Sequence, residues 1–185
     1  MAEEWRKLGE TVALTHPYVT VTYHAVALPD GVVIPDWPII YLRDYVNVVV
    51  LNDQGETLIQ EGYRYALGQT TWQIVGGLLE PGEEPLEAAQ RELLEETGYV
   101  CAEWQMLGHF VADANRHCGA GHFFLARRPV LAAAPHSGDL EQVTLQWLPL
   151  AELRVALFSG RFGVMSHAIN AALALLLLSH DGPRG

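Results

Sequence analysis

The sequence predicts an α+β fold in which short strands form a mixed sheet and helices come late in the chain. Three observations support this prediction. The first 75 residues alternate apolar and polar side chains, one well-marked helix follows residue 84, and a long apolar segment occupies residues 165–178. At 185 residues the chain fits one domain, or one domain with an additional arm.

Short runs of alternating or continuously apolar residues, bounded by turn-forming residues, are predicted as strands. Asp30-Gly31 and Asn52-Asp53-Gln54-Gly55 are typical turn sequences, and the second closes a hairpin. The predicted strands are residues 19–24, 39–42, 46–51, 57–60, 72–75, 101–111, 122–126 and 143–148. We place a loop over residues 129–138.

Three helices are predicted. The central helix starts at Pro85, which suits a first helical turn, and ends before Gly98, a typical C-terminal cap. Residues 151–158 form a short second helix. Residues 165–178 form a third, rich in Ala and Leu, which we expect to pack against the sheet or a partner.

Composition narrows the classes of partner. The formal net charge is −11, which argues against a nucleic-acid backbone as the main ligand, because phosphate contacts need patches of Lys and Arg. An acidic protein still binds phosphates when divalent cations stand between its carboxylates and the substrate. We therefore expect a small-molecule ligand and no nucleic acid.

The cysteines and the apolar segments indicate the cellular compartment. Cys101 and Cys118 make neither a disulfide framework nor a zinc quartet, so we expect two reduced thiols. Residues 1–10 are polar and are not followed by the apolar segment of a signal peptide. The longest apolar run, residues 171–178, is too short to cross a bilayer. These features predict no membrane association and a cytoplasmic location.

The predicted central helix carries the chemistry. Glu92, Glu95 and Glu96 are three or four residues apart, so their carboxylates project from one side of the helix. Arg91 offers only one positive charge against them. Such a cluster favours hard divalent cations such as Mg²⁺, which bind carboxylates together with substrate phosphates. The alternative interpretation is an acidic helix face that is merely solvated.

A second stripe of the same helix is apolar. Leu86, Ala89 and Leu93 fall beside the acidic side, and we expect this stripe to pack on the sheet. Glycines before the helix let backbone atoms approach a metal or a phosphate closely.

The stretch GLLEPGEEPLEAAQRELLEETGY, residues 77–99, resembles the Nudix box GX5EX7REUXEEXGU at every fixed position. Leu93 fills the first aliphatic position, whereas Tyr99 stands where an aliphatic residue is usual. The fixed positions are Gly77, Glu83, Arg91, Glu92, Glu95, Glu96 and Gly98.

This resemblance implies an α/β/α sandwich and water attack on a phosphorus of a nucleoside-diphosphate compound. It also implies metal ligands at Glu92 and Glu96, with Glu95 as a third ligand or a base. The backbone carbonyl of Gly76 resembles the family's backbone ligand. The implied cofactor is Mg²⁺, with Mn²⁺ as a substitute.

The resemblance assigns supporting roles as well. Glu83 and Arg91 correspond to residues that orient the acidic cluster. In the ADP-ribose and nucleoside-diphosphate-sugar pyrophosphatase branch of this family, a Glu in the loop before the 143–148 strand often serves as the base. Glu141 stands at that place, and Asp139 is a second choice.

Other segments resemble the ADP-ribose and nucleoside-diphosphate-sugar pyrophosphatase branch. Glu61-Gly62-Tyr63-Arg64-Tyr65 is similar to a segment whose Arg reaches a substrate phosphate, so Arg64 and Tyr63 are implied to bind substrate. Phe123-Phe124-Leu125-Ala126 and Trp147-Leu148-Pro149-Leu150 resemble two further segments of that branch.

Several positions depart from the branch. Gln73 stands where a Glu is common, Val75 where a Pro is common, and Ala114 near a usual Pro. Arg116, in the same loop as Ala114, is a further candidate for substrate binding, with an ordinary surface residue as the alternative. Trp37 is a candidate for stacking on a nucleobase.

The expected function is metal-dependent hydrolysis of a nucleoside-diphosphate compound, ADP-ribose or another nucleoside-diphosphate sugar. The alternatives are a different nucleoside-diphosphate-linked substrate, a catalytically silent nucleotide-sugar sensor and an acidic structural dimer. Residues 1–43 are expected to form an N-terminal β arm for homodimerisation, as is common in this branch. Residues 44–180 would then form the hydrolase domain and residues 181–185 a tail.

Overall fold

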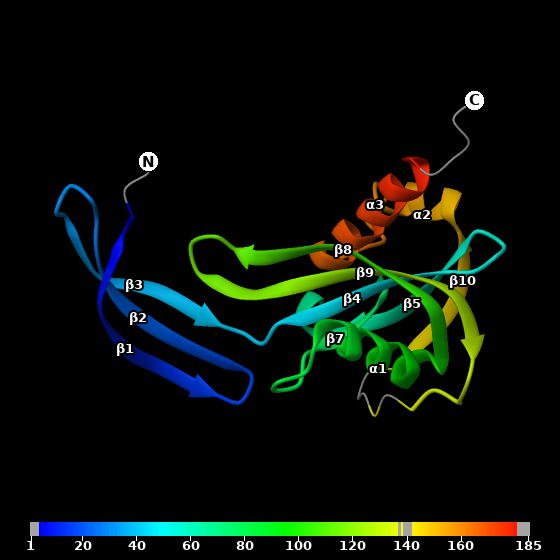
Figure 1. The fold of residues 1–185 in the computed structure, drawn as a ribbon, viewed down its shortest axis with the longest axis horizontal. Coiled ribbons are helices and arrows are strands. Elements are labelled where there is room, and N and C mark those ends of the chain that lie inside the picture. Colours follow the sequence, from blue (N-terminus) through cyan, green and yellow to red (C-terminus); the bar gives the residue numbers. More distant parts are fainter. Residues whose placement is uncertain (1–3, 137, 139–141, 181–185) are drawn as a thin grey trace. The chain divides into compact units, whose positions relative to one another are not determined.

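The computed structural model describes residues 4–136, 138 and 142–180 (Figure 1). Strands dominate the chain up to residue 149, α1 interrupts them, and two more helices close it. The elements are β1 (Arg6–His16), β2 (Val19–Ala27), β3 (Val33–Tyr41), β4 (Tyr45–Leu51), β5 (Glu56–Arg64), the 3₁₀ turn η1 (Tyr65–Leu67), β6 (Gln69–Gln73), β7 (Val75–Leu78), α1 (Pro85–Thr97), β8 (Tyr99–Asp113), β9 (His117–Leu131), β10 (Val143–Pro149), α2 (Leu150–Ala156) and α3 (Met165–His180).

The chain forms two compact units. The first contains the described residues of Met1–Asp44 together with Phe110–Gly121, the tip of the β8–β9 hairpin. The second contains Tyr45–His109 and the described residues of His122–Gly185. Each unit is described by itself.

In the first unit β1, β2 and β3 form an antiparallel meander. The start of β9 joins it, with Ile40 and His117 as a parallel pair. The N–H of Ile40 donates to the carbonyl of Arg116 at 2.9 Å. The indole N–H of Trp37 donates to the carbonyl of Asn115 at 2.8 Å. Antiparallel pairs and this parallel pair together give the mixed pairing expected from the sequence.

Large apolar side chains remain exposed on the first unit. A three-stranded sheet offers little to cover its faces, so much of its apolar surface stays in water. The exposed ones are Trp5, Leu8, Val12, Leu14, Tyr18, Tyr23, Val32, Val33, Tyr41, Leu42, Phe110 and Val111.

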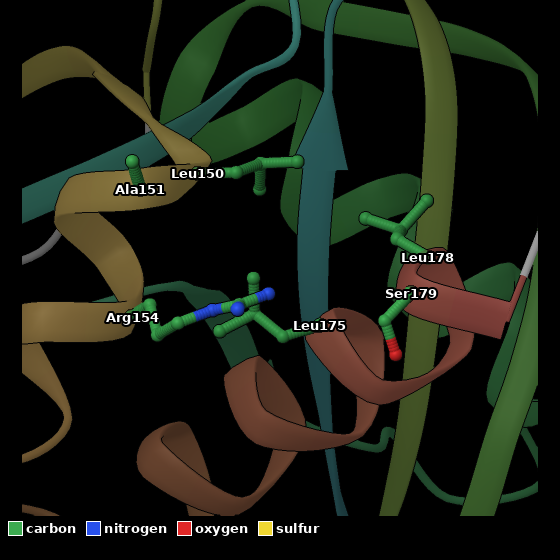
Figure 2. Close-up of a pocket in the computed structure, with 6 residues that line it drawn as sticks. All are labelled: Leu150, Ala151, Arg154, Leu175, Leu178 and Ser179. Atoms are coloured by element: carbon green, nitrogen blue, oxygen red, sulfur yellow. The ribbon is translucent and has the colours of Figure 1, made fainter. Parts of the chain in front are cut away.

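In the second unit β4 lies between β9 and β5, and β10 follows β5. One face of this sheet packs against α2 and α3. The buried residues on this side are Val49, Ile59, Ile74, Leu125, Leu148, Leu153, Ala171, Ala174 and Leu175. Between the two helices a groove of about 410 Å³ opens to the surface (Figure 2). Its lining is Leu150, Ala151, Arg154, Leu175, Leu178 and Ser179.

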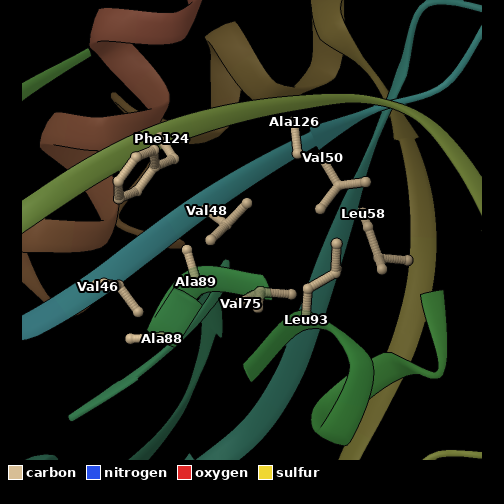
Figure 3. Close-up of a cluster of buried hydrophobic side chains, with 10 residues drawn as sticks. All are labelled: Val46, Val48, Val50, Leu58, Val75, Ala88, Ala89, Leu93, Phe124 and Ala126. Carbon is tan, nitrogen blue, oxygen red and sulfur yellow. The ribbon is translucent and has the colours of Figure 1, made fainter. Parts of the chain in front are cut away.

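The other face of the same sheet packs against α1 (Figure 3). Val48 and Val49 are neighbours on β4 but belong to opposite clusters, because successive strand residues point to opposite faces. The cluster under α1 consists of Val46, Val48, Val50, Leu58, Val75, Ala88, Ala89, Leu93, Phe124 and Ala126. Helices therefore cover both faces, and the predicted α/β/α sandwich is confirmed.

Several details differ from the sequence-based prediction, and residues 129–131, predicted as the start of a loop, belong to β9. Ala89 and Leu93 are fully buried as expected, but Leu86 is 40% exposed and Ala88 takes the buried position instead. The strand β1 was not predicted. Among the described residues, no helix has the length and apolar character needed to span a membrane.

Candidate active site

The helix α1 is held at both ends. Pro85 begins it, Glu87 lies in its first turn, and negative charge there complements the helix dipole. Gly98 ends it in the left-handed conformation, with φ of 75°, and donates its N–H to Leu94 at 2.8 Å. Because Ala89 and Leu93 are fully buried, the polar side of the helix has a fixed direction.

Arg91 links the acidic residues of this site. Its Nε and Nη2 donate to the two carboxylate oxygens of Glu83 at 2.8 and 2.9 Å, a bidentate pair. Its Nη1 donates to Glu92 at 2.8 Å and to Glu95 at 3.2 Å. Its Nη2 also reaches the carbonyl of Leu78 at 3.2 Å. The hydrogen bond that Arg91 donates to Glu83 is the largest cause of a pKa of Arg91 above its ordinary value, and Glu92 adds to it.

Glu96 is tied to the sheet instead. Its Oε2 accepts a hydrogen bond from Nε2 of Gln60 at 2.9 Å and from the backbone N–H of Gly76 at 3.1 Å. Gly76 lies on β7, opposite Asn47 of β4. The carboxylate of the helix and the peptide predicted to supply a backbone ligand are therefore neighbours.

The absence of a side chain at Gly77 allows the Glu92 carboxylate to lie against the β7 backbone. A Cβ built on Gly77 would lie closer than 3.0 Å to the carboxylate atoms of Glu92, which is shorter than real Cβ contacts. The missing side chain thus leaves room for this carboxylate beside the β7 backbone.

The donor chemistry suits a hard divalent cation. Three carboxylates, those of Glu83, Glu92 and Glu95, pair with the guanidinium of Arg91, and a fourth, that of Glu96, accepts hydrogen bonds from the sheet. Carboxylate and carbonyl oxygens are the ligands that Mg²⁺ and Mn²⁺ prefer. Over the described part of the chain, no three His, Cys, Asp or Glu side chains converge on one point as they stand. In this arrangement Glu92 and Glu95 both accept hydrogen bonds from Arg91.

The candidate substrate-binding residues of β5 belong to the second unit, which also contains α1. Arg64 donates two N–H groups to Oε1 of Gln73, the Nε bond being 2.7 Å long. Tyr63 is 52% exposed and available to a ligand. The positive charge of Arg64 also contributes, after burial, to lowering the pKa of His167 on α3 to about 4.

Arg116 belongs to the first unit. Its backbone N–H and its guanidinium both donate to Asp113, at 2.6 and 3.4 Å. The next two residues, His117 and Cys118, have left-handed φ angles of 75° and 57°, which is strained for residues other than glycine. Glu141 and Asp139, the predicted bases, lie outside the described residues.

Sequence reasoning missed two residues that touch the predicted ones. Gln60 contacts Glu96, and Gln73 contacts Arg64. A period of two along β5 places Gln60 on the same face as Leu58, toward α1, and that signal was available in the sequence. The two cysteines are free thiols as expected, and burial raises the pKa of Cys101 to about 12.

Comparison with known proteins decides the family. A model of the NUDIX domain matches residues 41–166, which is most of the chain. The chain belongs to the Nudix family. Nudix enzymes generally use divalent metal ions and act on small nucleoside-diphosphate compounds.

Two curated relatives and one solved structure are similar to this Nudix chain. It is 28% identical over 171 residues to the CMP-5'-(N-acetyl-N-hydroxy-3-aminopropyl)phosphonate hydrolase of Streptomyces rubellomurinus, covering 92% of this chain and 82% of that protein. It is 31% identical over 133 residues to the ADP-ribose pyrophosphatase of Mycobacterium tuberculosis, covering 70% of this chain and 63% of that protein. A crystal structure of an ADP compounds hydrolase superimposes with a TM-score of 0.83 at 18% identity, over 98% of both chains.

These similarities confirm four predictions about the Nudix chain. The family, the pyrophosphatase branch that it resembles and the fold class agree with the sequence analysis. The assignment as a Nudix pyrophosphatase is confirmed at the level of enzyme class.

Proposed function

We propose that the chain hydrolyses the diphosphate bond of a nucleoside-diphosphate sugar of the ADP-ribose type, using Mg²⁺ or Mn²⁺. Water adds to one phosphorus and the bridging oxygen leaves with the other. The products are a nucleoside monophosphate and a sugar phosphate. The ADP-ribose pyrophosphatase relative and the site on α1 both support this choice.

One observation carries the proposal. A helix with Glu92, Glu95 and Glu96 on one side lies against β7, where Glu96 and Gly76 are in direct contact. Solvated acidic faces do not need such ties, because water satisfies their carboxylates. This contact holds the Glu96 carboxylate beside the Gly76 peptide, which supports a role for both as oxygen ligands.

We assign the following roles within the proposal. Glu92, Glu96 and the Gly76 carbonyl bind the cation, and Glu95 is a third ligand or the base. When bound, the cation neutralises phosphate charge and lowers the pKa of the attacking water. Glu83 and Arg91 hold the acidic side chains in place.

The substrate and the base are assigned to other segments. Arg64 contacts a phosphate, and Tyr63 and Arg116 contact other parts of the substrate. Glu141 takes the proton from the water, with Asp139 as the second choice. Arg64 suits this role because a guanidinium donates in a fixed planar geometry that matches phosphate oxygens.

The test is a product screen with purified protein. ADP-ribose, other nucleoside-diphosphate sugars and nucleoside triphosphates are incubated with Mg²⁺, and the products are identified by mass spectrometry in ¹⁸O-labelled water. We expect one ¹⁸O atom from water in one of the monophosphate products, and no turnover when a chelator removes the Mg²⁺. Better hydrolysis of triphosphates than of any diphosphate sugar would overturn the substrate class.

A second substrate class is favoured by a specific observation. The relative that aligns over 92% of this chain is described as a hydrolase of a CMP-linked phosphonate. In such a compound a phosphate and a phosphonate share the bridging oxygen, so the same water attack releases CMP. Adding a CMP-linked phosphonate to the screen decides between the two classes.

A catalytically silent sensor is the other alternative. It predicts saturable binding of a nucleotide sugar with no product in the same screen. The full set of carboxylates on α1 supports catalysis instead.

The assembly and location belong to the same proposal. We propose a homodimer through the arm of residues 1–43, supported by the exposed apolar side chains of β1 to β3. We propose a cytoplasmic location, supported by two free cysteines.

A further inference from the structure

Two buried glutamines lie side by side on the face of the sheet that packs against α1. Gln60 on β5 and Gln73 on β6 are direct partners in the antiparallel pairing. They are 2% and 1% exposed, respectively. Directly opposed residues project to the same face of a sheet, so the two amides are neighbours under α1.

Each glutamine holds one charged residue. Nε2 of Gln60 donates to Glu96, and Oε1 of Gln73 accepts two N–H groups from Arg64. Glu96 also accepts the N–H of Gly76, so the Gln60 contact fixes a carboxylate that is already beside the β7 backbone. The pair thus connects a carboxylate of α1 to an arginine at the end of β5.

The orientation of Gln73 is dictated by Arg64. A guanidinium has only donors, so the amide must turn its oxygen toward it. Its Nε2 is then buried with no hydrogen-bond partner among the described residues. A buried donor without an acceptor is unfavourable, and here it accompanies the two bonds to Arg64.

We propose that Gln60 and Gln73 are separate positioning residues, Gln60 for the Glu96 carboxylate and Gln73 for the Arg64 guanidinium. The inference rests on the proposed function for the roles of those two residues, a metal ligand and a phosphate contact. Because both amides are neutral, they hold the two groups without cancelling the charge of either. Gln60 acts on the metal, and Gln73 acts on the nucleotide.

The test is a pair of neutral substitutions of similar volume, Gln60→Met and Gln73→Met. Calorimetry measures Mn²⁺ binding to the free protein and AMP binding without metal. We expect Gln60→Met to weaken Mn²⁺ binding about tenfold and AMP binding less than twofold. We expect Gln73→Met to weaken AMP binding about tenfold and Mn²⁺ binding less than twofold. This variant should also raise KM for ADP-ribose about tenfold, with kcat changed less than threefold.

The control is Gln146→Met. Gln146 is a half-buried glutamine of β10 whose register partner, Ile59, faces α2 and α3. Equal effects of both variants on both ligands, effects no larger than the control, or no Mn²⁺ binding by the wild type would overturn the inference. If a Met variant melts below the assay temperature, Gln60→Asn or Gln73→Asn replaces it, because the shorter amide cannot reach its partner.

The outcomes separate this inference from the proposed function. Absence of hydrolysis by the wild type, with the selective loss of Mn²⁺ and AMP binding still seen, rejects the activity and leaves the positioning roles intact. Hydrolysis by the wild type, with no selective loss of Mn²⁺ or AMP binding in the variants, supports the activity and rejects the positioning roles.

Discussion

At the scale of single residues, Glu96 is a carboxylate of α1 that the sheet holds in place. It accepts hydrogen bonds from Gln60 and from the Gly76 N–H. Replacing it by Gln removes the charge and keeps the size. We expect Glu96→Gln to lower kcat on the order of 10²-fold or more and to raise the Mg²⁺ concentration needed for half-activity.

The matched control for this variant is Glu87→Gln. Glu87 is an exposed carboxylate in the first turn of the same helix. Steady-state kinetics across a Mg²⁺ titration compares the two. Equal kinetics in both variants would contradict the role of Glu96.

Glu141 is a separate prediction at this scale. As the base, it takes the proton from the attacking water, so Glu141→Gln should lower kcat by roughly two orders of magnitude with substrate binding little changed. Single-turnover rates and equilibrium binding of substrate measure the two effects. Near-normal kcat would move the role to Glu95 or to the metal ions alone.

At the scale of elements, the strand β7 and the helix α1 meet at Gly77. A methyl group there overlaps the Glu92 carboxylate, which is the mobile end of a side chain and moves away at little cost in folding. We expect Gly77→Ala to keep its melting temperature within a few degrees and to need about tenfold more Mg²⁺ for half-activity.

Gly9→Ala is the control for Gly77→Ala. Nothing lies within 4 Å of a Cβ built on Gly9, and its φ angle suits any residue. Thermal melts and Mg²⁺ titrations of both variants test the prediction. A large loss of stability in Gly77→Ala would mean that the backbone moves rather than Glu92.

The start of α3 carries a pH-sensitive residue. Burial is the main cause that lowers the pKa of His167 to about 4, from an ordinary value of 6.5, and Asn47 lies 3.3 Å from its Nδ1. The neutral imidazole is favoured in the folded state. Its stabilising effect is complete above pH 6.5 and is lost as the pH falls toward 4.

We therefore expect the difference in melting temperature between wild type and His167→Gln to shrink from pH 7.5 to pH 4.5. Other groups titrate in this range in both proteins, and the comparison removes their contribution. Calorimetric melts at several pH values provide the measurement. A difference that stays constant with pH would show that His167 is not buried in its neutral form.

Most elements follow from sequence patterns, and the exceptions have physical reasons. The helix α1 was predicted with both ends, because Pro85 and Gly98 are strong local signals. The strand β1 was missed because its residues are mostly exposed, so no buried face imposes a clear pattern. The run 72–75 is split between β6 and β7, since β6 pairs with β5 and β7 pairs with β4.

The site shows the same division. The acidic residues were found because they lie within one helix, where spacing determines direction. The contacts of Gln60 with Glu96 and of Gln73 with Arg64 join residues from different elements. Such contacts depend on strand register, which the sequence leaves open until the sheet is known.

At the scale of the whole molecule, the assembly prediction depends on the first unit. Val12 on β1 is 57% exposed, and a charge there opposes burial in a dimer interface. We expect the wild type to be a dimer at micromolar concentration and Val12→Glu to be a monomer. Light scattering after size exclusion gives the mass of each.

Val155→Glu provides the control for the assembly test. Val155 lies on α2 in the second unit and is 67% exposed. Its variant should remain a dimer. A monomeric wild type, or equal behaviour of the two variants, contradicts an interface on β1 to β3.

The β8–β9 hairpin is divided between the two units, and this limits how the protein can be truncated into fragments. The chain leaves the first unit after Asp44, returns at Phe110 and leaves again after Gly121. A fragment that starts at Tyr45 therefore still carries twelve residues whose neighbours in the fold have been cut away. Exchanging the arm between homologous proteins requires grafting two separate sequence segments together, so the arm is not a cassette that a single gene fusion could transfer.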